Sequence, residues 1–164
     1  MDFAKIIREL ISLKQEGPYW DFKREWYSQD KKADLLHDII CMANNLENRD
    51  AYIIIGVDEE RDYSLMNVKL DVNRKNTQKI VDFLRDKKFA GGVRPVVYVQ
   101  EVELFGTGID VIVIKNSYET PFYLIENFQG VMANNIYTRI MDSNTPKNKS
   151  ADIFHIEYLW KKRF

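Results

Sequence analysis

The segment 51–57, AYIIIGV, constrains the fold more than any other part of the chain. Its apolar, aromatic and glycine residues have the length of a strand that is covered on both faces. The run is far shorter than the roughly 18 residues that a membrane-spanning helix needs. The chain is therefore expected to place this segment inside a sheet, with packed elements on both sides of it.

Helices are predicted where apolar residues recur at helical spacing. Asn76 is a suitable N-cap for the third of them, and Ser150 for the last. The four predicted helices cover residues 3–11, 33–43, 77–85 and the stretch after 150.

Further strands are predicted by alternation and by turn residues. Over residues 19–26, Trp20 and Phe22 are expected on one face of a strand, and Asp21 and Lys23 on the other. A hairpin is predicted from two apolar runs that flank a glycine-containing loop. The hairpin strands are 96–104 and 109–114, its loop is 105–108, and shorter strands are expected at 122–124 and 136–140.

This order of elements predicts an α+β fold, with one mixed sheet flanked by helices in a single domain over residues 1–164. The chain has 24 Lys and Arg against 25 Asp and Glu, which excludes a protein that coats nucleic acid through bulk charge. Cys41 is the single cysteine and forms no internal disulfide. The N-terminus has no apolar stretch of a secretory signal, so we expect a cytoplasmic protein that does not enter a membrane.

Acidic residues gather where elements end. Glu16 lies beside a Gly-Pro turn, Asp21 is on the polar face of a strand, and Asp58 and Glu59 follow the hydrophobic strand. Carboxylates that converge there would suit Mg²⁺ or Mn²⁺, and Lys23 could counter the charge on a phosphate. The alternative is that these acids are solvated at the ends of elements, which is the more common case.

Basic residues gather toward the C-terminus and would suit contacts to a nucleic-acid backbone. The alternative is a terminal helix whose charged face keeps the protein in solution, and the sequence alone favours that alternative. The candidate phosphate contacts are Lys23, Arg24, Arg94, Arg139, Lys147, Lys149, Lys161, Lys162 and Arg163.

Five segments, in this order, resemble the Schlafen-type AlbA_2 family of nucleic-acid-binding domains. None of them is decisive alone, but together they span most of the chain. They are EGPYWDFK at 16–23, DLLHDIICMAN at 34–44, IIIGVDE at 53–59, VRP at 93–95, and IYTR at 136–139 followed by SNT at 143–145.

The resemblance implies a mixed-sheet domain that interacts with nucleic acid. Some Schlafen proteins are metal-dependent endoribonucleases that cut tRNA or rRNA with three acidic residues. Matched by motif, those acids fall on Glu16, Asp21 and either Asp58 or Glu59, with Lys23 as the neighbouring base. The cofactor would then be Mg²⁺ or Mn²⁺.

Three functions follow as hypotheses. The leading one is a nucleic-acid-interacting domain that acts as a divalent-metal-dependent endoribonuclease on structured RNA such as tRNA. The first alternative is a non-catalytic regulatory module that binds DNA or RNA, and the second is a protein-interaction domain. Schlafen proteins carry paired lobes, so by analogy we expect a homodimer.

Overall fold

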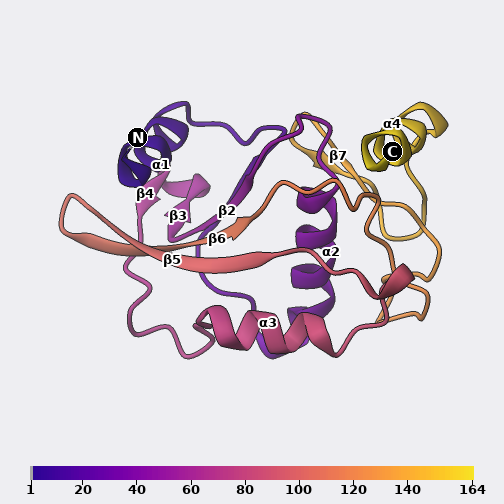
Figure 1. Ribbon diagram of the computed structural model, residues 1–164. Helices are drawn as coiled ribbons and strands as arrows, with labels where there is room; N and C mark the ends of the chain where they lie inside the picture. The colour runs from indigo at the N-terminus through magenta and orange to yellow at the C-terminus, as the bar shows by residue number, and fades with distance from the viewer. Residues whose placement is uncertain (1) are drawn as a thin grey trace.

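A four-stranded mixed sheet lies at the centre of the computed structural model, which describes residues 2–164 (Figure 1). Across the sheet the order is β1 (Trp20–Lys23), β2 (Ala51–Ile55), β6 (Thr107–Ile114) and β5 (Val97–Leu104). Strands β1 and β2 run parallel, whereas β2 with β6 and β6 with β5 run antiparallel. Strand β2 lies inside the sheet, as its apolar sequence predicts.

Helices cover both faces of this sheet. Tyr52 and Ile54 of β2 belong to the core cluster that includes Ile7 of α1 (Phe3–Ser12). Ile53 and Ile55 belong to the other core cluster, which includes residues of α2 (Lys32–Ala43) and α3 (Thr77–Arg85). Alternate side chains of one strand are thus buried on opposite faces. The fold class is α+β, as predicted.

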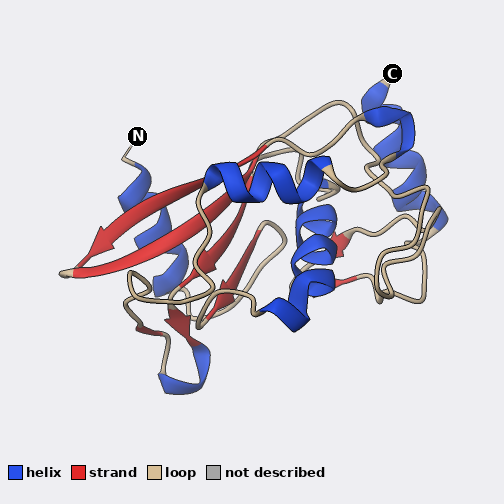
Figure 2. Cartoon of the chain, turned by 90° about the horizontal axis from the view of Figure 1, so that it is seen from below, coloured by secondary structure: helices blue, strands red, loops and turns tan. Residues whose placement is uncertain are grey.

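The remaining elements are short and lie in long connections, apart from one helix near the C-terminus (Figure 2). Helix α4 (Ile153–Arg163) and the tip of the β5–β6 hairpin lie at opposite ends of the molecule (Figure 1). The short strands are β3 (Val57–Asp58), β4 (Ser64–Leu65), β7 (Arg139–Ile140) and β8 (Ser143–Asn144), and the 3₁₀ helices are η1 (Gln29–Lys31), η2 (Glu59–Arg61) and η3 (Ala90–Gly92). None of the helices in residues 2–164 has the length and apolar content needed to cross a membrane.

Several predicted boundaries were wrong. The hairpin loop is only Phe105 and Gly106, since residues 107 and 108 pair with β5. The segment 122–124 has a single bridge, from Leu124 to Phe89, instead of a strand. Ser150 accepts a hydrogen bond from the N–H of Ile136 instead of capping α4. In the last two cases a tertiary contact overrides the local pattern.

Buried Asn44 joins the end of α2 to the C-terminal third of the chain. Its amide donates to the carbonyls of Phe122 and Tyr137, both at 2.8 Å, and accepts from the N–H of Phe122 at 2.8 Å. Thr138 donates its hydroxyl proton to the backbone carbonyl of Asn44. These bonds fix the segment that leads into β7 and so position Arg139.

Candidate functional site

Two charged side chains of β1 point toward α2. In the parallel register with β2, Asp21 lies beside Ile53 and Lys23 lies beside Ile55. Both isoleucines belong to the core on the α2 side of the sheet. Asp21 and Lys23 therefore lie on that side too, which confirms the predicted alternation along β1.

Glu16 reaches β1 from the turn that precedes the strand. Its Oε2 atom accepts a hydrogen bond from the backbone N–H of Phe22 at 2.8 Å. The turn is tight, because the N–H of Gly17 donates to the carbonyl of Trp20 at 3.1 Å. A Cβ atom on Gly17 would lie 2.2 Å from the Trp20 ring. Glycine at this position lets Glu16 fold back over the strand.

Glu16 keeps a proton at neutral pH. Burial, together with the hydrogen bond and negative charge of Asp21, raises the pKa of Glu16 to about 9, and a hydrogen bond with Glu59 adds to this. Burial alone would raise the pKa of Asp21, but the hydrogen bond from Glu16 and the charges of Lys23 and Arg139 hold it below its usual value. The two carboxyl groups thus share one proton, which resides on Glu16.

Lys23 lies between two buried acids. Its Nζ atom is 3.3 Å from Asp21 Oδ2 and 3.4 Å from Oδ2 of Asp38 on α2. Burial would lower the pKa of Lys23, but the charges of Asp38 and Asp21 outweigh it and raise that pKa. About a third of the Lys23 side chain, 35 %, is exposed to solvent. Lys23 is therefore a fixed positive charge that solvent can reach.

Asp38 is 7 % exposed and has three partners. Besides Lys23, its Oδ2 atom accepts a hydrogen bond from the Tyr27 hydroxyl at 2.6 Å, and its Oδ1 atom accepts from the Asn144 amide at 2.9 Å. Burial raises the pKa of Asp38, while the charge of Lys23 opposes that shift. Asp38 thus connects α2 to both β1 and β8.

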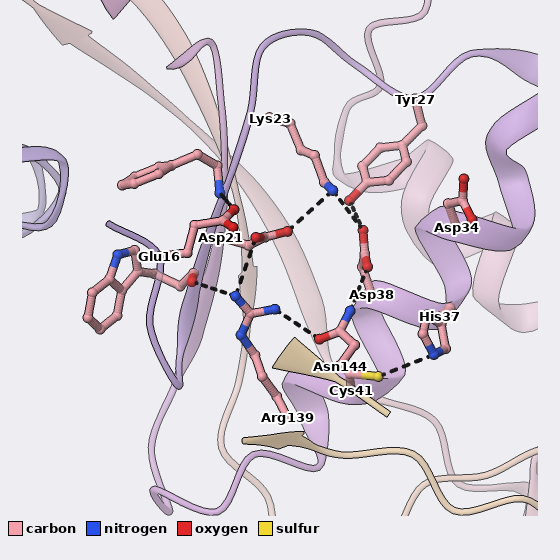
Figure 3. A network of polar contacts seen from close by, with 12 residues as sticks. Glu16, Asp21, Lys23, Tyr27, Asp34, His37, Asp38, Cys41, Arg139 and Asn144 are labelled. Carbon is pink, nitrogen blue, oxygen red and sulfur yellow. Dashed lines mark hydrogen bonds and ion pairs between the residues drawn. The ribbon is translucent and has the colours of Figure 1, made fainter. Parts of the chain in front are cut away.

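Arg139 closes this network from β7 and is 2 % exposed (Figure 3). Its Nε atom donates to the carbonyl of Gly17 at 2.7 Å, and its Nη1 atom donates to Asn144 Oδ1 at 2.9 Å. Its Nη2 atom lies 3.3 Å from Asp21 Oδ1. Each guanidinium nitrogen faces a protein acceptor, so Arg139 stabilises the site and is not available to a phosphate.

Asp58 and Glu59, which the sequence could not distinguish, have different surroundings. Asp58 is 4 % exposed, accepts a hydrogen bond from the N–H of Glu60 at 3.1 Å, and pairs with Arg61 at 3.7 Å. Its carboxylate therefore caps η2. Glu59 is exposed and contributes to the raised pKa of Glu16.

The carboxyl oxygens suit a hard divalent ion chemically, but their placement does not. Mg²⁺ and Mn²⁺ prefer oxygen ligands, yet the two oxygens of Asp21 face Lys23 and Arg139, and Oε2 of Glu16 faces a backbone N–H. Across residues 2–164, no three His, Cys, Asp or Glu side chains form a group that could hold a metal ion. As placed, these residues do not fit the predicted ion.

Two pockets give the network access to solvent. One has a volume of about 300 Å³ and is lined by residues that include Lys23, Lys31 and Asp38. The other has a volume of about 400 Å³ and is lined by residues that include Glu16 and Asp142. A ligand can therefore approach the network at the Lys23 end and at the Glu16 end.

The structure does not bring the other predicted basic residues to this network. Arg94 donates to three backbone carbonyls between residues 84 and 92, where it holds the end of α3. Arg24 is exposed, beside Glu25. Within residues 2–164, no hydrogen bond or ion pair joins Glu16, Asp21 or Lys23 to the C-terminal basic residues after Arg139.

Those C-terminal residues are dispersed. Lys147 pairs with Asp34 on α2. Lys162 and Arg163 attach α4 to the segment 116–119 through hydrogen bonds of 2.7 and 2.5 Å. Lys149 and Lys161 are exposed. Their role in binding nucleic acid stays a prediction.

Sequence reasoning missed Asp38, Tyr27 and Asn144. Asp38 could most readily have been predicted from the sequence, because a charged residue within an otherwise apolar stretch of a helix signals a buried partner. Neither Tyr27 nor Asn144 carries a comparable signal. Cys41, expected in the core, is fully buried, with its Sγ atom 3.6 Å from Nε2 of His37.

Comparisons with known proteins agree with this fold. The family model for Schlafen, AlbA_2 matches residues 16–148, and no curated protein matches the chain. The crystal structure of the DIP2311 protein from Corynebacterium diphtheriae is similar, with a TM-score of 0.50 and 16 % sequence identity. That match covers 85 % of this chain and 28 % of the other, so this chain spans less than a third of that protein. By the family match, the chain belongs to the Schlafen AlbA_2 family.

Proposed function

We propose that the protein binds nucleic acid and that a backbone phosphate contacts Lys23. The family supports a relation to nucleic acid. The observation that carries the proposal is that Lys23 holds a fixed positive charge at the edge of a pocket, between the buried acids Asp21 and Asp38. A fixed ammonium group binds a phosphate without the entropic cost of ordering a free lysine side chain.

The charge balance of the network permits a phosphate. With Glu16 protonated, Lys23 and Arg139 match the charges of Asp21 and Asp38 even when both of these acids are ionised. Ionisation of Glu16 would give the network a net negative charge and repel a phosphate. Binding should therefore weaken as the pH approaches the raised pKa of Glu16, about 9.

A binding titration tests this function. Fluorescence anisotropy with labelled single-stranded RNA, an RNA hairpin and a DNA duplex, each over a range of salt concentrations, measures affinity and its salt dependence. We expect Lys23→Gln to weaken binding about tenfold. The slope of log affinity against log salt concentration should fall by the contribution of about one phosphate contact. Lys115→Gln is the control, since Lys115 is an exposed lysine that pairs with Asp50.

Circular dichroism of each variant separates lost binding from lost folding. If folded Lys23→Gln binds as the wild-type protein does, Lys23 is not the phosphate contact. If the wild-type protein binds no nucleic acid at low salt, the proposed function is wrong. The homodimer expected by analogy stays a prediction, and sedimentation velocity on the same samples measures it.

Cleavage of structured RNA such as tRNA is the second candidate function. The observation that favours it is the shared proton: a carboxylic acid that stays protonated at neutral pH, beside the carboxylate of Asp21 and the charge of Lys23, is typical of general acid–base sites. A water molecule would attack the phosphorus as the bond to the leaving oxygen breaks, with Asp21 accepting the proton of that water and Glu16 giving its proton to the leaving oxygen. Lys23 would stabilise negative charge on the phosphate.

Incubation of tRNA with the protein in Mg²⁺, Mn²⁺ or EDTA tests cleavage and any dependence on a divalent ion. Loss of cleavage in Glu16→Gln and Asp21→Asn, with cleavage retained in Lys115→Gln, would support this candidate. Equal cleavage by all of these proteins would identify a contaminating nuclease. Absence of cleavage under all three conditions would leave a binding domain.

A further inference from the structure

A second charged region lies at the start of α3, outside the site described above. A pocket of about 550 Å³ is lined there by residues 74–79, together with residues of β5 and β6. Lys75 and Lys79 line this pocket, and Lys32 begins α2. Within residues 2–164, none of these three lysines forms an ion pair.

Both acids that line the same pocket pair with one arginine. Asp110 is fully buried and accepts from Arg74 at 2.9 and 3.0 Å and from the Trp26 indole at 2.8 Å. Glu101 pairs with the same arginine. The three basic residues of the pocket lining, Arg74, Lys75 and Lys79, therefore exceed its two acids by one positive charge.

The charges of Lys32 and Lys79 act on Lys75. Burial and the charges of Lys32 and Lys79 lower the pKa of Lys75, and Asp71 opposes this only in part. Both carboxylate oxygens of Asp71 accept backbone N–H groups, at 2.9 and 2.8 Å. Like charges that gather without a counter-charge cost free energy, and a bound anion would offset that cost.

The first turn of α3 adds to this positive potential. The Asn76 side chain caps the N–H of Lys79 at 2.9 Å, and the aligned peptide dipoles favour an anion at this end of the nine-residue helix. The geometry therefore places backbone dipoles and lysine charges around one open pocket.

We propose that Lys75 and Lys79, which line this pocket, hold a backbone phosphate of the bound nucleic acid, at a position separate from Lys23. The proposal rests on the proposed function and extends it. A polyanionic chain is favoured over an isolated phosphate because Lys31, which lines the pocket of Lys23, is followed in the chain by Lys32, whose charge acts on Lys75.

The test compares two double variants that remove the same charge. Lys75→Gln/Lys79→Gln alters the α3 region, and Lys5→Gln/Lys88→Gln removes two exposed lysines, on α1 and beyond the C-terminal end of α3, that form no ion pair in residues 2–164. Fluorescence anisotropy with single-stranded RNA, at salt concentrations from about 50 to about 200 mM, measures the affinity and the salt slope of both variants. We expect the first variant to bind about tenfold more weakly, with a salt slope lower by about 0.7 for the loss of one phosphate contact, and the second to match the wild-type protein.

Each outcome has a separate meaning. RNA binding by the wild-type protein with no change in Lys75→Gln/Lys79→Gln overturns this inference and leaves the proposed function intact. Equal losses in both double variants also overturn it, because bulk charge would then explain the effect. If the wild-type protein binds no RNA, the proposed function fails, and the phosphate site fails with it as a nucleic-acid site. Tripolyphosphate, titrated in parallel while the lysine Nζ signals are followed by NMR, identifies a site for free polyphosphate.

Discussion

Lys23 and Lys75 are the same residue type in two charged regions, yet their pKa values shift in opposite directions. Burial lowers the pKa of both, but Asp38 and Asp21 reverse this for Lys23, whereas Lys32 and Lys79 add to it for Lys75. Neighbouring charge, more than depth, therefore decides the electrostatic state of each lysine. The first region is internally balanced, and the second has an excess of positive charge.

The two regions should respond differently when a charge is removed. In the Lys23 region each charged group has a buried partner, so the loss of one leaves another uncompensated. In the α3 region the loss of a lysine removes repulsion. Stability measurements can therefore test whether the two regions differ in this way.

Arg139→Met should have the largest effect on stability. It leaves the buried carboxylate of Asp21 with one cation fewer and removes the donor that the Gly17 carbonyl accepts. We expect the free energy of unfolding to fall by about 3–5 kcal/mol, measured by urea denaturation. Exposed Arg24→Met is the control and should change it by less than about 0.5 kcal/mol. A loss below about 1 kcal/mol for Arg139→Met would show that the buried charges of the network do not depend on Arg139 for their stability.

Asp38→Asn should have the next largest effect. The new amide nitrogen replaces one of the two carboxylate oxygens and cannot accept a hydrogen bond. It would face either the Asn144 amide, or the Tyr27 hydroxyl and the Lys23 ammonium. The expected loss is about 1–3 kcal/mol in the same denaturation experiment. Asp34→Asn, one turn earlier on α2, removes a more exposed pair with Lys147 and should cost about 1 kcal/mol or less. Similar losses for both variants would contradict the importance assigned to burial.

Glu16 should make stability fall as the pH rises. The folded protein holds the Glu16 proton up to a pKa of about 9, whereas in the unfolded chain this group releases it near 4.5. Between these values the folded state binds more protons, so the free energy of unfolding decreases with increasing pH. One proton sets a limit of about 1.4 kcal/mol per pH unit, and solvent around the partly exposed side chain reduces the slope below that limit.

Glu16→Gln removes this dependence because the amide does not ionise. Urea denaturation of both proteins from about pH 6 to pH 9 gives the difference in slope, in which groups common to both proteins cancel. The wild-type protein should lose stability relative to the variant over that window. Parallel pH profiles would indicate that Glu16 is ionised in the folded protein.

Lys75→Gln/Lys79→Gln should have the smallest effect on stability. Removing two like charges that have no ion-pair partner in residues 2–164 relieves repulsion, so the free energy of unfolding should stay constant or rise by about 0.5 kcal/mol or less. Thermal and urea denaturation at low salt check this. A loss above about 1 kcal/mol would show that these lysines hold the fold together, and the comparison with the Lys23 region would fail.

Elements with a strong local signal were predicted well. The N-cap Asn76 and the bounds of α3 were correct, since a cap and a helical period act within one turn. The alternation in β1 correctly put Asp21 and Lys23 on the face opposite Trp20 and Phe22. Ser150 failed as a cap because its hydroxyl bonds to Ile136, a residue that no local pattern connects with it.

Periodicity and composition are enough to predict that an apolar strand lies inside a mixed sheet and that Asp21 and Lys23 share a face, and the order of the segments is enough to indicate the AlbA_2 family. These properties are local. The fold is needed to show that Asp38 and Arg139 join β1, and that Lys75 and Lys79 share a pocket with residues of β5 and β6. These arrangements join residues far apart in the chain, and a pKa depends on distance in space rather than in sequence.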